Sequence, residues 1–191
     1  MQEIMPGLWR WTAKHPAWRP AAEPDSADDW PEDVGSVAYD APRALVLVDP
    51  LVPREDLLDD LVERLDKPVA ILQTVRFHGR SREQLEARYA DRLTTDPGPG
   101  VEPMPIAGAG ETMVWLAEPR ALVPGDRLLG DGRGGLRMCP DSWMRYLPLD
   151  QAGLAESLRP LLDLPVEAVV VSHGEPVLRD GHAAISAAIS G

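Results

Sequence analysis

Hydrophobic residues in the first half of the chain alternate between strand-like runs and helix-like spacings. Residues 36–39 and 44–48 are two short β-branched and apolar runs separated by a turn with Asp and Pro, which predicts a hairpin. Apolar positions at helical spacing predict an amphipathic helix over residues 53–65. The apolar run 68–74 is typical of a buried strand, and Ser81 begins a capping-box spacing that predicts a second helix.

The second half contains further strand and helix signals. Residues 96–105 are rich in Pro and Gly and predict a loop, and residues 112–116 and 121–123 predict two strands. A long Gly-containing loop is expected over 125–140. The last part predicts a helix carrying Leu154 to Leu162 that Pro160 kinks, a buried strand over 166–172 and a short helix that Asp180 caps and that ends at Ile189.

This pattern predicts an α/β fold, because each half has strands followed by a helix. A length of 191 residues is that of a single domain, residues 1–191, with a sizeable hydrophobic core. Two similar sheets packed together with helices outside suit this order of elements.

The charge and cysteine content exclude several classes of function. With 19 Lys and Arg against 31 Asp and Glu, the net charge of −12 repels nucleic acid and anionic lipid, so neither is expected as a partner. The lone Cys139 cannot form an internal disulfide or a Cys-x-x-Cys zinc site. No signal peptide or membrane-spanning run is evident, so a cytoplasmic protein is expected.

Four polar segments follow predicted strands, at 48–50, 73–81, 124–126 and 170–176. Their order resembles that of the metallo-β-lactamase-fold superfamily, which contains many hydrolases. Leu45 to Pro50 is similar to the family's strand that ends in a buried Asp, and Ile71 to Thr74 to the strand before its metal-binding loop. Ala121 to Asp126 resembles the segment with the bridging carboxylate, and Val169 to Pro176 the segment with the last His ligand. The resemblance implies a four-layer αββα sandwich with mixed sheets.

The metal-binding motif of that family is largely missing. Its His-x-His-x-Asp-His follows a Thr, and alignment on Thr74 places non-ligating side chains at all of its ligand positions, namely Val75, Phe77, Gly79 and Arg80. Ala109 stands where a further His is expected. Only Asp126 and His173 remain, whereas a catalytic zinc takes about three protein ligands. The first interpretation is therefore a metal-free pseudoenzyme or small-molecule pocket protein without a cofactor.

Two alternatives remain open. In the first, His78, Asp126 and His173 hold a single zinc or other divalent metal, and the protein hydrolyses a small ester, thioester or lactone. Against it, His78 falls on a spacer position of the motif, where strand alternation would point its side chain away from the ligands. In the second, the acidic surface and Trp-bearing loops bind a protein partner. The oligomeric state stays open.

The candidate catalytic residues are His173, Asp126 and Glu175, the last as a general base, although an exposed Glu175 is the simpler expectation. His173 and Asp126 have a structural alternative, as hydrogen-bonding groups at strand ends. His15 and His182 are expected on the surface.

The candidate substrate-binding residues are Arg76, Arg80, Trp143 and Tyr146. Arg suits the binding of carboxylate or phosphate, and the aromatic pair could form a pocket wall. We expect Asp49, His78, Asp126 and His173 to converge. We also expect Arg80 or Arg76 to hydrogen-bond Asp126 or Asp49 and to replace the lost metal as the local positive charge.

Overall fold

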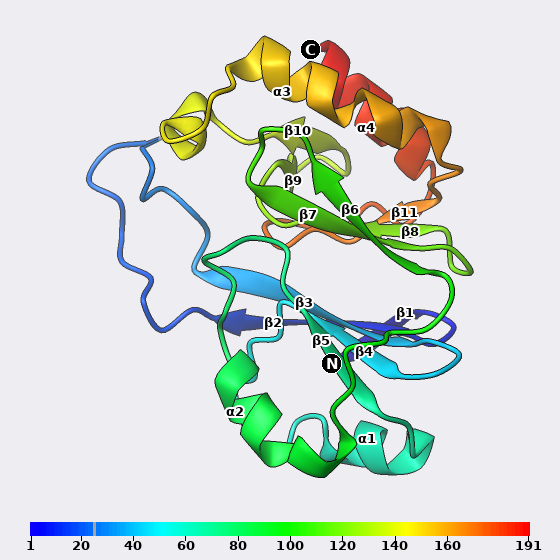
Figure 1. Ribbon diagram of the computed structural model, residues 1–191. Coiled ribbons are helices and arrows are strands. Elements are labelled where there is room, and N and C mark those ends of the chain that lie inside the picture. Colours follow the sequence, from blue (N-terminus) through cyan, green and yellow to red (C-terminus); the bar gives the residue numbers. More distant parts are fainter. Residues whose placement is uncertain (25) are drawn as a thin grey trace.

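Two β-sheets pack face to face, and helices cover the outer face of each (Figure 1). The structure is a computed structural model that describes residues 1–24 and 26–191. The first sheet has the order β1-β2-β3-β4-β5, with β1 (Gln2–Met5), β2 (Leu8–Lys14), β3 (Asp33–Asp40), β4 (Leu45–Val48) and β5 (Val69–Leu72). The second has the order β11-β8-β7-β6, with β11 (Ala168–Val169), β8 (Ala121–Val123), β7 (Glu111–Leu116) and β6 (Val101–Ile106). The hairpin of β9 (Leu128–Gly130) and β10 (Leu136–Met138) adjoins the second sheet (Figure 1).

Helices α1 (Asp59–Leu65) and α2 (Arg82–Arg88) lie outside the first sheet, and α3 (Gln151–Leu158) and α4 (Gly181–Ser190) lie outside the second (Figure 1). Short 3-10 helices extend the set, namely η1 (Ala90–Arg92), η2 (Asp141–Met144) and η3 (Arg159–Asp163). Both sheets are mixed, because β4–β5 and β8–β11 pair in parallel while the other pairs are antiparallel. The predicted αββα sandwich with mixed sheets is confirmed.

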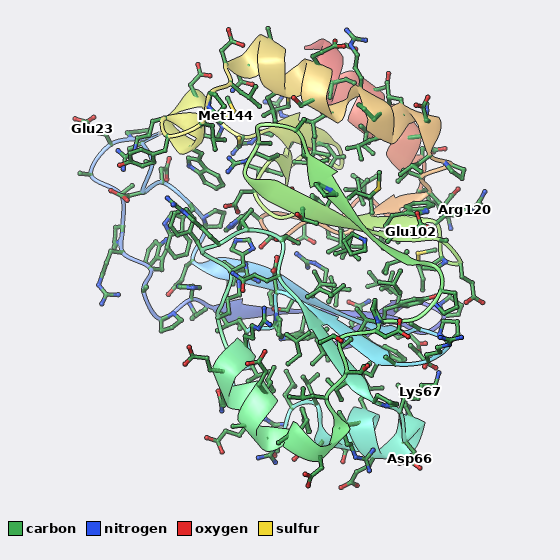
Figure 2. All side chains as sticks on the ribbon, in the orientation of Figure 1. Glu23, Asp66, Lys67, Glu102, Arg120 and Met144 are labelled. Atoms are coloured by element: carbon green, nitrogen blue, oxygen red, sulfur yellow. The ribbon has the colours of Figure 1, made fainter. Side chains whose placement is uncertain are left out.

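Alternating side chains on each central strand build the layers. On β4, Val46 and Val48 pack between the sheets, whereas Leu45 and Leu47 pack under α1 and α2. On β7, Val114 and Leu116 face the first sheet, and Met113 and Trp115 pack toward α3 and α4. Figure 2 shows side chains filling the spaces between these layers. Continuous apolar runs in β4 and β7 therefore mean burial on both faces.

Several predicted elements differ from the structure in length, helix type or capping. Helix 53–65 is shorter than expected, since regular α-helix begins only at Asp59, and the strand expected over 166–172 is reduced to β11. Residues 159–163 continue α3 as a 3-10 helix that contains Pro160, where a kink was expected. Ser81 precedes α2 without a side-chain cap, because its hydroxyl accepts a hydrogen bond from the Val52 N–H instead. Asp180 also lacks a side-chain capping bond.

Strands also occur where none was predicted. β6 lies in the expected loop 96–105 and extends past it, and it tolerates Pro103 and Pro105 because it is an edge strand of its sheet. β9 and β10 lie in the expected loop 125–140, and β1 and β2 precede the first predicted strand. No helix in the described part of the chain is long and apolar enough to cross a bilayer.

Candidate functional site

The polar strand ends meet at one edge of the sandwich. Asp49 follows β4 and the 74–80 loop follows β5, its parallel neighbour. Asp126 and His173 follow β8 and β11, which are parallel neighbours in the other sheet. Parallel pairing places the carboxyl ends of neighbouring strands at the same edge, where ligands commonly bind. The expected convergence of Asp49, His78, Asp126 and His173 is confirmed, with 3.3 Å between Asp126 Oδ1 and His173 Nε2.

Asp49 holds the 74–80 loop to the end of β4. Its Oδ1 accepts a hydrogen bond from the Thr74 N–H at 2.9 Å, and its Oδ2 accepts one from the Thr74 hydroxyl. Oδ2 also lies 2.7 Å from Nδ1 of His78. Asp49 has a positive φ of 47°, a conformation that Asp tolerates better than most residues. Three buried donors therefore share one buried carboxylate.

His78 faces the candidate ligands, so the expectation that it points away is wrong. Its Nε2 lies 3.1 Å from Asp126 Oδ1. The chain turns immediately after Thr74, with a His78 N–H to Val75 carbonyl hydrogen bond of 2.9 Å, so the alternation of an extended strand does not continue to residue 78. The imidazole is thus held between two carboxylates, Asp49 on Nδ1 and Asp126 on Nε2.

His78, Asp126 and His173 each offer one ligand atom, and these atoms lie within 4.8 Å of one another. Asp126 Oδ1 is 3.1 Å and 3.3 Å from the two Nε2 atoms, yet it is buried and has no hydrogen-bond partner among the described residues. The oxygen is therefore at ion-pair distance from both imidazoles without a well-aligned hydrogen bond to either. In a tetrahedral zinc site with bonds of about 2.0–2.2 Å, ligand atoms stand roughly 3.3–3.6 Å apart. The donor set, and the distances of Asp126 Oδ1 to the two imidazoles, fit a single divalent metal with three protein ligands.

Burial and neighbouring charges shift the titration of this cluster. Burial alone disfavours the imidazolium of His78, but the carboxylates of Asp126 and Asp49 outweigh it and raise the pKa of His78 to about 9. Burial opposes the charged form of Asp126, and the two imidazoles overcome it and hold the pKa of Asp126 well below its usual range. Burial lowers the pKa of His173 below its ordinary value, although the carboxylate of Asp126 opposes this.

A buried carboxylate that the sequence did not single out positions Asp126. Glu111, at the start of β7, accepts hydrogen bonds from the N–H groups of Gly125 (2.9 Å), Asp126 (2.7 Å) and Arg127 (2.9 Å). Burial, reinforced by the charge of Asp126, raises the pKa of Glu111 to about 7. Gly125 is required here, because a Cβ would lie 2.4 Å from Thr74 Oγ1. The only sequence signal for Glu111 is an acidic residue beginning an apolar run.

Arg80 supports the backbone of the site. It donates hydrogen bonds to the carbonyls of Gly35 (2.6 Å) and Asp49 (2.7 Å) and to the Ser172 hydroxyl (2.6 Å). Arg80 therefore contacts the main chain of Asp49. The expected hydrogen bond from Arg80 to the carboxylate of Asp49 or Asp126 is not formed. The side chain that lies between those carboxylates is His78, because the turn after Thr74 places its imidazole there. Arg76 is exposed and stacks on Phe77, with its guanidinium carbon 4.4 Å from the ring centroid.

A cavity of about 550 Å³ opens over the cluster. His78, Asp126 and His173 line it, and the candidate binding residues Arg76, Arg80, Trp143 and Tyr146 line it as well. Trp143 packs edge-on against His173 at 5.4 Å between ring centroids, and Trp30 does so at 6.3 Å.

Three other residues complete the placement of the sequence candidates. His15, expected on the surface, lines this cavity beside Trp30, whereas His182 is exposed as expected. The sequence did not predict Trp30 or His15 as pocket residues, because the loop between β2 and β3 carries no motif. Glu175 is exposed and outside the cavity lining, so it does not join His173 as a general base in this arrangement.

Comparison with known proteins assigns the fold. No protein-family profile and no curated sequence matches the chain. Solved structures do match over nearly its whole length. A metallo-β-lactamase from Erythrobacter litoralis in its mono-zinc form is 16% identical with a TM-score of 0.58, over 99% of this chain and 94% of that one. DIM-1 metallo-β-lactamase exposed to ceftazidime is 11% identical with a TM-score of 0.63, over 99% and 95% of the two chains. A metallo-β-lactamase family protein from Thermus thermophilus is 16% identical with a TM-score of 0.53, over 98% and 80%. The chain has the metallo-β-lactamase fold.

Proposed function

We propose that the protein is a hydrolase with a mononuclear metal site held by His78, Asp126 and His173, acting on a small ester, thioester or lactone. The observation that carries the proposal is the convergence of three possible ligand atoms, one each from His78, Asp126 and His173, within 4.8 Å of one another in the lining of the cavity. Asp126 Oδ1 lies at ion-pair distance from both imidazoles without a well-aligned hydrogen bond, a geometry that a shared metal ion accounts for. Two imidazoles and one carboxylate form a common catalytic zinc set.

The surroundings of the three ligands support the same function. A metal-binding His commonly donates its other ring N–H to a carboxylate, and Asp49 stands in that place behind His78. Bound zinc supplies Lewis-acid polarisation of a carbonyl oxygen and activates water for attack. One protein with the same fold, from Erythrobacter litoralis, has a mono-zinc form, so a single metal is compatible with this architecture.

The protein's own residues supply positioning and exclusion of water. Asp49 fixes the ring of His78, and Glu111 fixes the backbone on both sides of Asp126. Trp30 and Trp143 flank the ring of His173 and reduce its contact with water. With Glu175 outside the cavity, no side-chain general base beyond the cluster is assigned.

Calorimetric titration with zinc tests the proposal on protein stripped with chelator and then freed of chelator by gel filtration. One zinc should bind per chain, and Asp126→Asn and His173→Asn should each weaken binding by about a hundredfold, because two ligands hold a metal poorly. His182→Asn, at an exposed His outside the cavity lining, should bind zinc as the wild type does. Zinc-dependent hydrolysis across a panel of p-nitrophenyl esters, thioesters and lactones should disappear in the same two variants.

A second candidate is a metal-free pocket protein, the interpretation that the depleted motif favours. It is supported by His78, whose ring bridges Asp49 at 2.7 Å and Asp126 at 3.1 Å and thereby supplies a positive charge without a metal. Stoichiometric binding of zinc rejects this candidate. Failure of micromolar zinc to bind at pH 7.5, with the fold intact by circular dichroism, rejects the hydrolase.

A further inference from the structure

Buried polar atoms without partners gather around the cavity. In the described part of the chain, these side-chain atoms are Arg80 Nε, Asp126 Oδ1, Ser142 Oγ, Trp143 Nε1, His173 Nδ1 and Arg10 Nε, and all but the last belong to residues that line the cavity. A metal would satisfy Asp126, but it would leave Ser142 and Trp143 unchanged. Their unused hydrogen-bonding capacity calls for a second group.

Ser142 and Trp143 form a pair of adjacent donors on η2. The indole N–H can only donate, so only an acceptor can satisfy it. The segment is held in place, because Arg127 reaches the Trp143 carbonyl at 3.5 Å while its Nε donates to the Ala109 carbonyl at 3.0 Å. The Trp143 ring also packs against His173. The segment that carries the two donors is therefore held next to His173 through Trp143.

The charge of the cavity lining is opposite in sign to that of the chain. The protein has a net charge of −12, yet Arg76, Arg80, Arg127 and Arg145 line the cavity against the acids Asp28 and Asp126. Arginines around a concave site attract anions, and the acidic outer surface repels them from elsewhere. The lining thus favours a ligand with a negatively charged oxygen group.

Two exposed aromatic rings line the same cavity. Phe77 is 68% exposed and Tyr146 is 74% exposed, unusual values for such large apolar side chains. Each is stacked by the neighbouring arginine, Arg76 at 4.4 Å and Arg145 at 4.7 Å from the ring centroid. These pairs come from different loops, one after β5 and one after η2. They offer flat apolar surface for the uncharged part of a ligand.

We propose that the cavity recognises a small aryl or acyl compound carrying a carboxylate or phosphate group, with Ser142 Oγ and Trp143 Nε1 donating to the anionic oxygens. The apolar part of the compound lies against Phe77 and Tyr146. The inference rests on the proposed function in one respect: it names the substrate class of that hydrolase, so the scissile group lies near His78, Asp126 and His173. Recognition of the anion itself requires no metal.

Calorimetry on metal-free protein, after chelator is removed, tests the recognition with three matched probes. Phenylacetate and phenyl phosphate carry the two kinds of anion, and phenylacetamide is the neutral control. Both anions should bind at least about tenfold more tightly than the amide, as expected for charge-assisted hydrogen bonds. Tighter phenyl phosphate identifies a phosphate site, and tighter phenylacetate a carboxylate site.

Ser142→Ala and Trp143→Phe remove one donor each and retain the packing. Each should weaken anion binding about fivefold to tenfold and leave phenylacetamide unchanged, whereas Ser190→Ala on α4 should alter neither. Equal affinity for anion and amide, or unchanged anion affinity in both variants, would overturn the inference and assign the two donors to water. Anion discrimination without zinc binding would reject the hydrolase alone, and zinc binding without anion discrimination would reject the anion site alone.

Discussion

His78 Nδ1 lies 2.7 Å from Asp49 Oδ2, so the imidazole that faces Asp126 is oriented from behind by a second carboxylate. The two residues come from parallel neighbouring strands, Asp49 after β4 and His78 in the loop after β5. The contact links the first sheet to the candidate metal ligands. Removing it should therefore lower both the free energy of unfolding and the affinity for metal.

Replacing Asp49 by Ala should lower the free energy of unfolding by about 3–5 kcal/mol, because three buried donors lose their acceptor. Urea denaturation of chelator-treated protein at pH 7 measures the change. Asp56→Ala is the matched control, since its carboxylate is exposed and should matter by less than about 0.5 kcal/mol. A loss below about 1 kcal/mol in Asp49→Ala would contradict the structural role assigned to this carboxylate.

The metal-free protein should lose stability as the pH rises from about 6.5 to about 9. The pKa of His78 is raised to about 9 in the folded state from an ordinary value of 6.5. Its stabilising contribution is therefore complete below pH 6.5 and is lost as the pH rises through the folded pKa. The loss should reach at most about 3 kcal/mol. Denaturation series at several pH values measure it.

His78→Gln is the reference for that series and should lack this pH dependence, while His182→Gln should keep it. If the stability of His78→Gln falls with pH as steeply as that of the wild type, a group other than His78 causes the pH dependence.

Replacing Glu111 by Ala should destabilise the protein by about 2–5 kcal/mol, because the N–H groups of three consecutive residues, Gly125 to Arg127, lose their acceptor. Glu102→Ala on β6 is the control, since Glu102 is exposed (Figure 2). Zinc affinity should also fall in Glu111→Ala, as the backbone that presents Asp126 loosens. Thermal denaturation and zinc titration together check both effects, and two variants of equal stability would refute the assignment.

Gly125→Ala should cost at least about 1–3 kcal/mol, because the added Cβ would lie 2.4 Å from Thr74 Oγ1 in a fully packed region. Gly79→Ala is a close comparison in the facing loop, since a Cβ there meets no atom within 4 Å and its φ is not positive. Chemical denaturation should find Gly79→Ala neutral or slightly stabilising. Equal effects at both glycines would mean that the two loops do not approach as closely as described.

The sequence predicts the fold class and the position of the site because both depend on the order of the strands and on the residue types at the end of each strand. Asp49, Asp126 and His173 are recognisable as polar residues directly after apolar strands. The orientation of His78 depends on the turn that begins after Thr74. If the strand is assumed to continue to residue 78, its alternation places the His78 side chain on the wrong face.

Other parts of the site depend on contacts between segments that are distant in the chain. In the sequence, Glu111 has the pattern of an exposed residue at the start of a strand. Only the fold shows that it binds the backbone of Gly125 to Arg127. Trp30 and His15 reach the cavity through a loop without a motif. β9 and β10 were missed because each has three residues within a Gly-rich segment, too short for periodicity to register.

The two prolines of β6 have a consequence for how this protein meets other chains. β6 is a free edge of its sheet, and Pro103 and Pro105 lie at alternate positions facing Val114 and Thr112 of β7. Both therefore remove N–H donors from the same side of the strand. An incoming strand would find consecutive hydrogen-bonding sites blocked. The edge therefore offers fewer donors to another strand, which disfavours the addition of a second chain to this sheet.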